Sequence, residues 1–404
     1  MKTIVFLMSS YSTLNTGVGG HYRSLKEIVS ILQPDFRVRV FTYGNVPSPV
    51  LKTLDCYRHV EAGHLLSPAT WRTLRSIRHE LDLGPADEVL YVSVGDLTTY
   101  VPILFCLGLG SGPVALVKPG GPVFNHSYMF NGLPLMVFHR QDYSRFAGYD
   151  SKRPLMLAPG RVSPPSHDPD YLNMAVPQWL DKQEQPLRLL TICRVAEEKS
   201  VSMSVMYGAL EKLGNQHGKL QSVHIGIEQS RNVLNRLNQY QLQFDHRILV
   251  DEAIVDTAAR AAHACDLFVG LGRCVMEAMA LGKIAFVPVN DHDGAPRLVA
   301  VTSDNWRVFQ NHNFTDRTPM AELEAAGERV FIEDVVGEYE RWRHLGTDGE
   351  EIFSNHLSIE TSTSAWREFY ERARNFRASR YQDVMRLFYV LAVTLKRQVR
   401  PIKR

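Results

Sequence analysis

Short apolar runs alternate with amphipathic stretches along most of the chain. In the first half, the runs have the length of buried strands, and the periodic stretch at 21–32 is typical of a helix. Strands that alternate with helices indicate a parallel sheet covered by helices. The predicted strands of this half are 3–8, 37–42, 89–94, 114–118, 134–139 and 154–158. We therefore expect a first Rossmann-like domain over residues 1–165.

A second series of the same kind follows a proline-rich segment. Six of the 21 prolines lie between residues 159 and 186, which predicts an interdomain linker over 166–186. A second domain is expected over 187–355, with a further helix at 359–374. Its predicted strands are 187–192, 222–226, 247–250, 267–269 and 284–287, with a helix at 203–213. Two Rossmann-like domains with a cleft between them are the simplest architecture, and a ligand would bind at the carboxyl ends of the strands.

Composition fits a globular protein of two domains. The chain has 404 residues, of which 45% are hydrophobic and 22% charged, so a large core is possible and disorder is not expected. The five cysteines are scattered singly, which argues for a reducing compartment and against a disulfide framework or a zinc site. The apolar run at 4–8 is too short for a secretion signal, and no stretch has the length of a membrane span. We expect a cytoplasmic protein.

The charge is uneven along the chain. Residues 372–404 contain ten Arg or Lys and one acid, Asp383, so this segment carries +9 while the other 371 residues sum to −7. The apolar run at 387–395 is suited to lie in a bilayer surface, and flanking basic residues are attracted to anionic lipid by about 1 kcal/mol per charge. A last helix packed on the protein body and a nucleic-acid-binding arm are the alternatives. We favour contact of residues 374–404 with an anionic membrane surface.

The segment 264–287, ACDLFVGLGRCVMEAMALGKIAFV, combines two buried strands with a loop and a short helix. Gly270 and Gly272 lie in the loop, and Glu277 lies one turn into the helix. Backbone N–H groups at a helix N-terminus bind anions such as a diphosphate, and Glu277 could reach a sugar hydroxyl beside it. Units of this kind are also common in α/β enzymes that bind other ligands.

Two further places carry candidate chemistry. Arg194 ends the first strand of the second half and Lys199 follows five residues later, so an Arg fork and a Lys charge could bind a diphosphate. Cations at a strand end are also common as surface charge. In the first half, Gly17, Gly19 and Gly20 follow the first strand, where they either approach a phosphate or form a tight turn before the helix. The spacing is not GxGxxG, which argues against a nicotinamide cofactor.

These segments resemble family-4 glycosyltransferases, which are retaining enzymes with the GT-B fold that use nucleotide-diphosphate sugars. ACDLFV…MEAMALGK is similar to their donor-binding segment. Arg194 and Lys199 match the family's R-x4-K, whose side chains clamp the diphosphate, although Cys193 stands where glycine is usual. The resemblance also implies that Gly19 and Gly20 face the donor across the cleft.

The resemblance runs from the first strand to about Ala373. It implies that the helix over 356–373 crosses back to the first domain. Arg161, in APGRV, occupies the place of the family's PNGV before the linker.

Two departures from the family pattern affect the sugar site. Members commonly carry E-x7-E, whose first glutamate recognises the donor sugar and whose second, matched by Glu277, binds the ribose. Eight places before Glu277 stands Val269, so the segment with the first glutamate is missing and GLGR replaces it. Either the amides of 270–273 or the Arg273 guanidinium then contact the donor, or Arg273 is an exposed charge.

The second departure lies in the first domain. Lys118-Pro-Gly-Gly-Pro stands where many members have a His near the sugar. His126 and His139 lie nearby, but a single His is more often structural.

The resemblance implies a glycosyltransferase that moves a sugar from a nucleotide-diphosphate donor to a glycan or lipid-linked acceptor with retention, in bacterial surface polysaccharide synthesis at the inner membrane face. No cofactor or metal is expected, because Asp291-His-Asp293 has DxD spacing but follows the last donor strand. A sugar-nucleotide epimerase and a non-catalytic nucleotide-binding or scaffolding relative are the alternatives. The candidate catalytic residues are Arg194, Lys199 and Glu277, and the candidate donor-binding residues are Gly19, Gly20, Arg194, Lys199, Gly270, Gly272, Arg273 and Glu277.

Overall fold

The chain forms two compact units, Met1–Pro159 together with Ser362–Arg404, and Gly160–Thr361. The chain thus returns to the first unit at its end, as the resemblance implied. The boundary lies at 159/160 instead of the predicted 165, and residues 356–361 belong to the second unit. The computed structural model describes residues 1–10, 19–63, 68–81, 87–95, 113–119, 132–148, 153–179, 186–214, 220–255, 257–377 and 379–399.

The first unit is built on a seven-stranded sheet in the order β3-β2-β1-β4-β5-β6-β7, and all its strand pairs are parallel. Its strands are β1 (Lys2–Ser10), β2 (Arg37–Gly44), β3 (Tyr57–Glu61), β4 (Glu88–Val94), β5 (Val114–Lys118), β6 (Leu135–Val137) and β7 (Leu155–Leu157). Its helices are α1 (Gly20–Leu32), α2 (Pro68–Glu80), α4 (Arg140–Ala147), α15 (Thr363–Arg374) and α16 (Arg380–Val399). Every predicted strand of this half is present, and β3 was not predicted.

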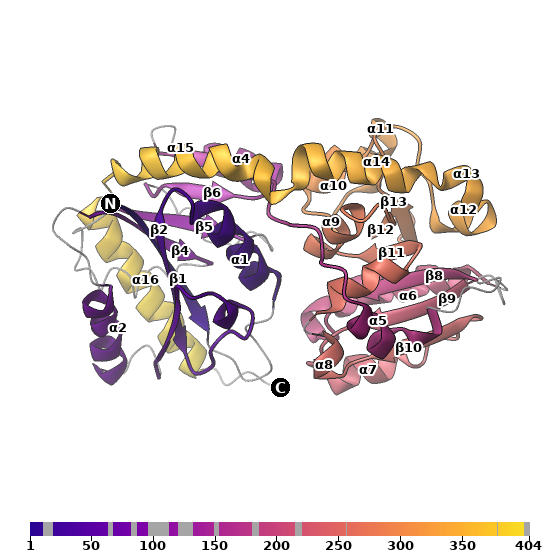
Figure 1. Ribbon diagram of the computed structural model, residues 1–404, viewed down its shortest axis with the longest axis horizontal. Helices are drawn as coiled ribbons and strands as arrows, with labels where there is room; N and C mark the ends of the chain where they lie inside the picture. Colours follow the sequence, from indigo (N-terminus) through magenta and orange to yellow (C-terminus); the bar gives the residue numbers. More distant parts are fainter. Residues whose placement is uncertain are drawn as a thin grey trace. The chain divides into compact units, whose positions relative to one another are not determined.

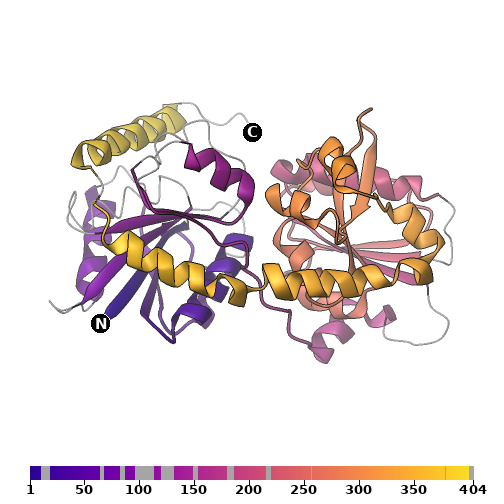
Figure 2. The same cartoon turned by 90° about the horizontal axis from the view of Figure 1, so that it is seen from above.

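The central strand β1 packs on both faces of the sheet. Its successive side chains point to opposite faces, and those on both faces are buried. Phe6 packs edge-on against Trp366 of α15, with ring centroids 6.1 Å apart. Val5 and Leu7 belong to the core cluster on the other face, which includes Val390 of α16. The helices α15 and α16 therefore cover opposite faces of the first sheet (Figure 1, Figure 2).

Helix α15 is fixed to the first unit by polar contacts at the start of β4. The Tyr370 hydroxyl donates to the Glu88 carbonyl oxygen at 2.8 Å, and Arg374 pairs with the Glu88 carboxylate. Lys2 of β1 pairs with Glu371 at 2.6 Å. These contacts confirm the prediction that a late helix packs on the first domain.

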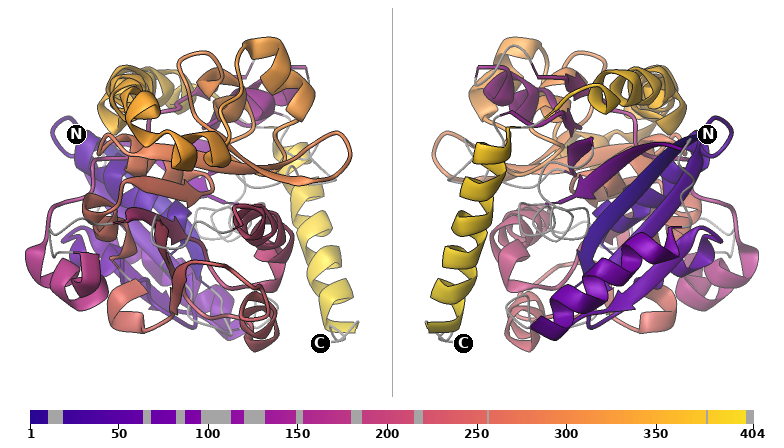
Figure 3. Two further views of the ribbon diagram at one scale, coloured as in Figure 1. Left: turned by 90° about the vertical axis from the view of Figure 1, so that its right-hand side faces the viewer. Right: turned by 90° about the vertical axis from the view of Figure 1, so that its left-hand side faces the viewer.

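Helix α16 contains most of the basic segment that we expected at a membrane, and it stands along one flank of the first unit (Figure 3). Its apolar residues divide between two faces. Leu387, Tyr389 and Val390 pack on the core, as the packed-helix alternative required. The opposite face exposes Phe388, whose side chain is 63% accessible, together with Tyr381 (73%) and Met385 (45%).

The second unit is built on a six-stranded sheet in the order β10-β9-β8-β11-β12-β13, parallel except for the antiparallel edge strand β13 (Figure 1). Its strands are β8 (Leu187–Ile192), β9 (Leu220–Ile225), β10 (Asp245–Leu249), β11 (Leu267–Gly270), β12 (Ile284–Asn290) and β13 (Pro296–Ala300). Its helices are α5 (Pro169–Ala175), α6 (Ser200–Lys212), α7 (Arg231–Leu237), α8 (Glu252–Val255), α9 (Arg273–Met279), α10 (Trp306–Asn311), α11 (Met320–Ala326), α12 (Ile332–Gly337), α13 (Tyr339–Trp342) and α14 (His344–Ile352).

The predicted linker is partly a helix of the second unit. Asp168 caps α5, because its carboxylate accepts the Tyr171 N–H at 3.1 Å, and Pro169 suits the first helical turn. The Tyr171 hydroxyl donates to the Ile254 carbonyl oxygen at 3.0 Å, and Arg260 pairs with Asp168. Pro169 therefore marks a helix start within the second unit, and residues 168–175 do not form an open linker.

The core of the second unit contains a polar network beneath the β8–β9–β10 edge. The Tyr207 hydroxyl of α6 lies 2.8 Å from Nδ1 of His224 and 3.1 Å from Nε2 of His246. His224 Nε2 is 2.9 Å from the Cys193 carbonyl oxygen, and His246 Nδ1 is hydrogen-bonded to Ser222. Burial lowers the pKa of His224 to about 4, and burial with the nearby His224 lowers the pKa of His246 to about 3. Both imidazoles are therefore neutral near pH 7.

We expect this network to make the second unit acid-sensitive. A histidine whose pKa lies near 6.5 unfolded and about 4 folded binds more protons in the unfolded state, so its stabilisation is complete above pH 6.5 and is lost as the pH falls toward 4. For His224 the loss is on the order of 3 kcal/mol. Urea denaturation between pH 7.5 and 4.5 measures it, and His224→Gln is the control. Equal pH slopes for the wild type and this variant would contradict the assignment.

Candidate functional site

The second sheet reverses its strand order between β8 and β11. The chain fills β9 and β10 on one side of β8 and then crosses to the other side. In open α/β sheets, ligands bind outside the carboxyl ends of the strands at such a point. β8 and β11 pair in parallel, with Ile192 opposite Gly270. The loop that carries Arg194 and the loop that leads to Arg273 therefore leave the sheet side by side.

Arg194 and Lys199 lie on the loop between β8 and α6. The Arg194 guanidinium is partly exposed, lies 3.1 Å from the Glu198 carboxylate and donates to the Gln229 amide oxygen at 3.3 Å. Lys199 is the residue before α6, and its ammonium makes no hydrogen bond or ion pair with the residues that the structure describes. Two cations from one short stretch thus lie at the strand-order reversal, where an anion could bind both.

The loop between β11 and α9 is only two residues long. Gly272 has φ 62° and ψ −124°, a conformation open to glycine at low cost, and its N–H donates to the Phe314 carbonyl oxygen at 2.7 Å. A Cβ at Gly270 would lie 2.6 Å from the Phe268 ring. The two glycines permit this tight turn, but the Gly272 amide binds protein and is not directed to a ligand. The predicted cradle of loop amides is therefore smaller than expected.

Arg273 and Glu277 form a buried ion pair on α9. The Arg273 Nε donates to Glu277 Oε1 at 2.7 Å, and both side chains are less than 10% accessible. A second donor of Arg273 bonds the Arg161 carbonyl oxygen at 2.7 Å. Of the alternatives left open for Arg273, the exposed charge is therefore wrong. Glu277 Oε2 accepts no hydrogen bond within the described part of the chain.

Arg161 joins this pair from outside the sequence segments that we singled out as donor-binding. Its guanidinium donates to the Asn313 side-chain oxygen. Burial, together with the neighbouring charge of Arg273, lowers the pKa of Arg161 to about 9, so it remains a cation at neutral pH. The cluster of Arg161, Arg273 and Glu277 therefore contains two buried guanidinium groups, of which that of Arg273 pairs with the Glu277 carboxylate.

The loop at 312–318 connects the two sides of the site. Asn313 and Phe314 both have positive φ (59° and 50°), which is unusual for a bulky side chain such as Phe314. The Phe314 carbonyl oxygen binds the Gly272 N–H, and the Asp316 carboxylate accepts the Ser202 hydroxyl of α6 at 2.9 Å. This loop therefore ties the β11–α9 turn to the beginning of α6. Strained backbone of this kind is concentrated at functional sites.

The predicted glycine loop of the first unit is partly visible. Gly19 precedes α1, its carbonyl oxygen accepts the Tyr22 N–H at 3.0 Å, and Gly20 is the first helical residue. These contacts are those of a turn before a helix. Gly17 lies outside the described residues. That Gly19 and Gly20 bind a donor stays a prediction.

The ends of β5 and β6 hold a buried charge cluster in the first unit. Lys118 pairs with Asp142 at 2.7 Å, and His139 Nε2 lies 2.9 Å from the same carboxylate oxygen. Burial raises the pKa of Asp142, but His139 and Lys118 together outweigh it, so that the pKa is lowered. His139 also accepts the Asp142 N–H at the start of α4, which is a structural contact. His126 lies outside the described residues.

The DxD-like pair lies in the turn between β12 and β13. Asp291 accepts the His292 N–H and Asp293 accepts the Ala295 N–H, both at 2.8 Å. Asp291 also pairs with Arg297 at 3.3 Å. Both carboxylates thus stabilise the turn. Within the described ranges, no group of three or more His, Cys, Asp or Glu side chains could hold a metal ion.

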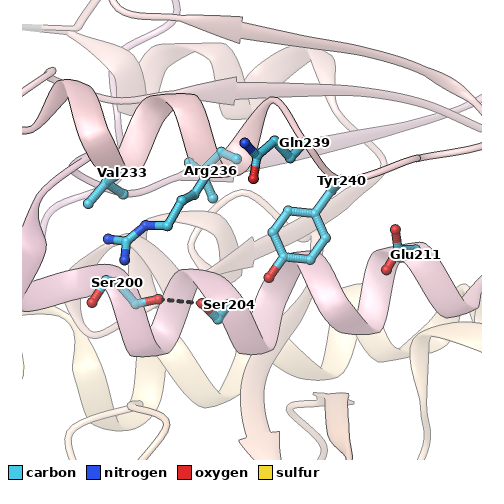
Figure 4. Close-up of a pocket in the computed structure, with 8 residues that line it drawn as sticks. Ser200, Ser204, Glu211, Val233, Arg236, Gln239 and Tyr240 are labelled. Atoms are coloured by element: carbon cyan, nitrogen blue, oxygen red, sulfur yellow. Dashed lines mark hydrogen bonds between the residues drawn. The ribbon is translucent and has the colours of Figure 1, made fainter.

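A separate pocket of about 350 Å³ lies between α6 and α7 (Figure 4). Ser200, Ser204 and Tyr240 are among its lining residues, and Arg236 reaches across it from α7. The Ser204 hydroxyl bonds the Ser200 carbonyl oxygen at 2.9 Å. Among the described residues that line it there is none of the donor-binding residues that we predicted.

The backbone of the chain is similar to that of solved glycosyltransferase structures. A Rickettsia africae glycosyltransferase has a TM-score of 0.60 at 12% identity, covering 92% of this chain and 98% of that one. The Anabaena protein HepE, in complex with UDP and glucose, has a TM-score of 0.62 at 14% identity, with coverages of 91% and 99%. The chain has the GT-B fold. The pneumococcal O-GlcNAc transferase GtfA, in complex with UDP and GlcNAc, has a TM-score of 0.56 at 10% identity, with coverages of 92% and 99%.

At these identities the GT-B likeness establishes the fold. The predicted architecture of two Rossmann-like domains is confirmed. Neither a family model nor a curated protein sequence matches the chain. In the described part of the chain, no helix has the length and apolar character that crossing a membrane requires.

Proposed function

We propose that this protein is a retaining glycosyltransferase that takes its sugar from a nucleotide-diphosphate donor. The observation that carries the proposal is the pairing of β8 with β11, which brings Arg194 and Lys199 beside the buried cluster of Arg161, Arg273 and Glu277. The GT-B fold adds support, because solved structures of this fold include proteins in complex with UDP and a sugar.

Each group has a role that suits its chemistry. Arg194 and Lys199 would bind the diphosphate, because a planar guanidinium and a compact ammonium are the usual partners of phosphate oxygens. Glu277 Oε2 would accept a ribose hydroxyl, while Oε1 is held by Arg273. Arg161 and Arg273 would stand in for the missing first glutamate and contact the donor.

A retaining transfer on this scaffold needs little covalent chemistry from the protein. The acceptor hydroxyl would attack from the face that the diphosphate leaves, and the developing negative charge would be stabilised by cations already in place. We expect no requirement for a metal ion, because Arg194 and Lys199 would supply that charge. An acceptor of glycan or lipid-linked type in surface polysaccharide synthesis is part of the proposal.

A thermal-shift screen with UDP, GDP, ADP, CMP and their common sugar conjugates, in the presence of EDTA, tests the proposal. A ligand that binds only the native state raises the unfolding midpoint by mass action. We expect a shift with one nucleoside diphosphate that is absent in Arg194→Ala. No shift with any of them would favour the non-catalytic alternative. Turnover of the donor with water as sole acceptor and epimerised product would identify the epimerase.

We also propose that the exposed face of α16 contacts an anionic membrane surface, where a lipid-linked acceptor would be found. Tyr381, Met385 and Phe388 are exposed and lie three or four residues apart, and thus on one side of the helix. Exposed Arg377 lies before them, and the sequence adds further basic residues after them. Arg386 would not take part, because it is buried in a 2.6 Å pair with Asp383.

Replacing both Met385 and Phe388 by Asp is expected to lower binding to vesicles with 30% anionic lipid by at least about tenfold, because apolar contact is lost and repulsion is added. Vesicle flotation measures the effect. Met174→Asp is the control, since Met174 is half exposed in the second unit. Truncation before α16 would be a poorer test, because Val390 belongs to the core. Equal flotation of wild type and the double variant would contradict the membrane contact.

A further inference from the structure

The polar network in the second unit ends at the backbone beside the diphosphate-binding residues. His224, on β9, is fully buried, and its Nε2 lies 2.9 Å from the Cys193 carbonyl oxygen. Cys193 is the residue immediately before Arg194. The backbone carbonyl of the first residue after β8 is therefore held by a side chain from the neighbouring strand.

Each hydrogen bond of the network has one assignable donor, and the donors follow one direction from the Ser222 hydroxyl to the Cys193 carbonyl oxygen. A carbonyl oxygen only accepts, so His224 Nε2 must carry the proton, and Nδ1 of the neutral ring then accepts from the Tyr207 hydroxyl. The Tyr207 oxygen in turn accepts from His246 Nε2, and His246 Nδ1 accepts from the Ser222 hydroxyl. Every polar atom of the chain from Ser222 to Cys193 has its partner, so each ring is fixed in tautomer and orientation.

The backbone at Gly226 approaches the Cys193 carbonyl group very closely. A Cβ at Gly226 would overlap the Cys193 carbonyl oxygen, so only glycine permits this approach between the end of β9 and the end of β8. The Cys193 N–H still donates to Ile225 at 3.3 Å, and the Val195 N–H donates to Ile227 at 3.0 Å. The His224 contact lies between these two ladder bonds, at the residue before Arg194.

We propose that His224, held by Tyr207 and His246, is a positioning residue that fixes the backbone of Cys193–Lys199 and thereby aims Arg194 and Lys199 at the diphosphate. The aim toward a diphosphate rests on the proposed function, whereas the fixing of the backbone does not. His224 itself touches no substrate. Its loss acts through the cations that follow Cys193.

Hydrogen–deuterium exchange tests the backbone part without any ligand. In His224→Leu, amides of residues 193–199 are expected to exchange at least tenfold faster than in the wild type, while those of β1 and β2 in the first unit are unchanged. In His224→Gln, whose side-chain amide can still donate to the Cys193 carbonyl, exchange is expected to stay within about threefold of the wild type. Wild-type exchange of residues 193–199 in His224→Leu would overturn the proposal, even if the wild type bound no nucleotide.

A double-mutant cycle tests the link to Arg194. The quantity measured is the ratio of nucleoside diphosphate to nucleoside monophosphate affinity, by calorimetry on the folded proteins. His224→Leu is expected to lower this ratio about tenfold, and His224→Gln is expected to restore most of it. Added to Arg194→Ala, His224→Leu should lower the ratio by clearly less than about tenfold, because only its effect through Lys199 remains. Full additivity of the two losses would show a general structural defect and overturn the positioning role. Absence of nucleotide binding in the wild type would count against the proposed function alone.

Discussion

Replacing Arg194 by alanine is expected to lower the rate of nucleoside diphosphate release from the donor sugar by about 100- to 1,000-fold. The reason is that a fixed cation stabilises the charge that develops on the leaving diphosphate, and losing one such group costs about 3–4 kcal/mol in comparable sites. Lys199→Ala should have an effect of the same kind. The measurement is steady-state release of the nucleoside diphosphate with the donor found in the thermal-shift screen.

Glu198→Gln is the matched control for Arg194→Ala. Glu198 is mostly exposed and pairs with Arg194 at 3.1 Å, so an incoming diphosphate must compete with it for the guanidinium. Exposed pairs contribute about 0–1 kcal/mol, so releasing Arg194 should raise diphosphate affinity by up to about fivefold. Turnover in Arg194→Ala within threefold of the wild type would reject its role. Weaker binding in Glu198→Gln would place the diphosphate elsewhere.

The fold could be predicted to a large extent because its strands are continuous apolar runs. β5, with the sequence VALVK, begins where its apolar run begins and ends one residue beyond it, at Lys118. β3, read YRHVE, has charged and polar residues among the apolar ones, and β13 begins with Pro296 and pairs antiparallel at the sheet edge. Neither has the pattern of a strand buried on both faces, so neither was predicted.

The basic segment at 374–404 shows a second limit of prediction from the sequence. Its run at 387–395 is apolar almost throughout, so the sequence does not distinguish a helix face on the core from a face on a membrane. The structure places Val390 in the core and leaves Phe388 exposed, although they are only two residues apart. Which side of an apolar helix faces the protein depends on the surface it packs against.

The sequence could predict only those residues of the candidate site that lie close together along the chain. The spacing of Arg194 and Lys199 lies within one loop, and the resemblance could be judged residue by residue. The contact of Arg161 with Asn313 joins residues 152 positions apart, and no pattern in either segment predicts it. An Asn that tolerates positive φ is a weak signal at Asn313, and Phe314 gives none. Burial of Arg273 follows from this tertiary packing, so sequence alone left it open.

Glu277→Ala is expected to destabilise the second unit by about 3–5 kcal/mol, because it leaves Arg273 buried without its carboxylate and close to the second cation, Arg161. Glu277→Gln keeps an oxygen acceptor for Arg273 but loses the charge, so its cost should be intermediate. The measurement is urea denaturation followed by tryptophan fluorescence, to which Trp179, Trp306 and Trp342 of this unit contribute. Glu198→Ala is the control and should cost less than about 1 kcal/mol, because its side chain is exposed.

A double variant that removes both charges tests whether Glu277→Ala destabilises the unit through the unpaired Arg273 charge or through the loss of side-chain volume. Arg273→Met combined with Glu277→Ala should recover at least half of the stability lost in Glu277→Ala, since the buried cation is removed together with its partner. Nucleotide affinity should not recover with it, because the acceptor for the ribose hydroxyl is still absent. A cost below about 1 kcal/mol for Glu277→Ala would mean that another group neutralises Arg273, and the pair could then not be what holds α9 at this site.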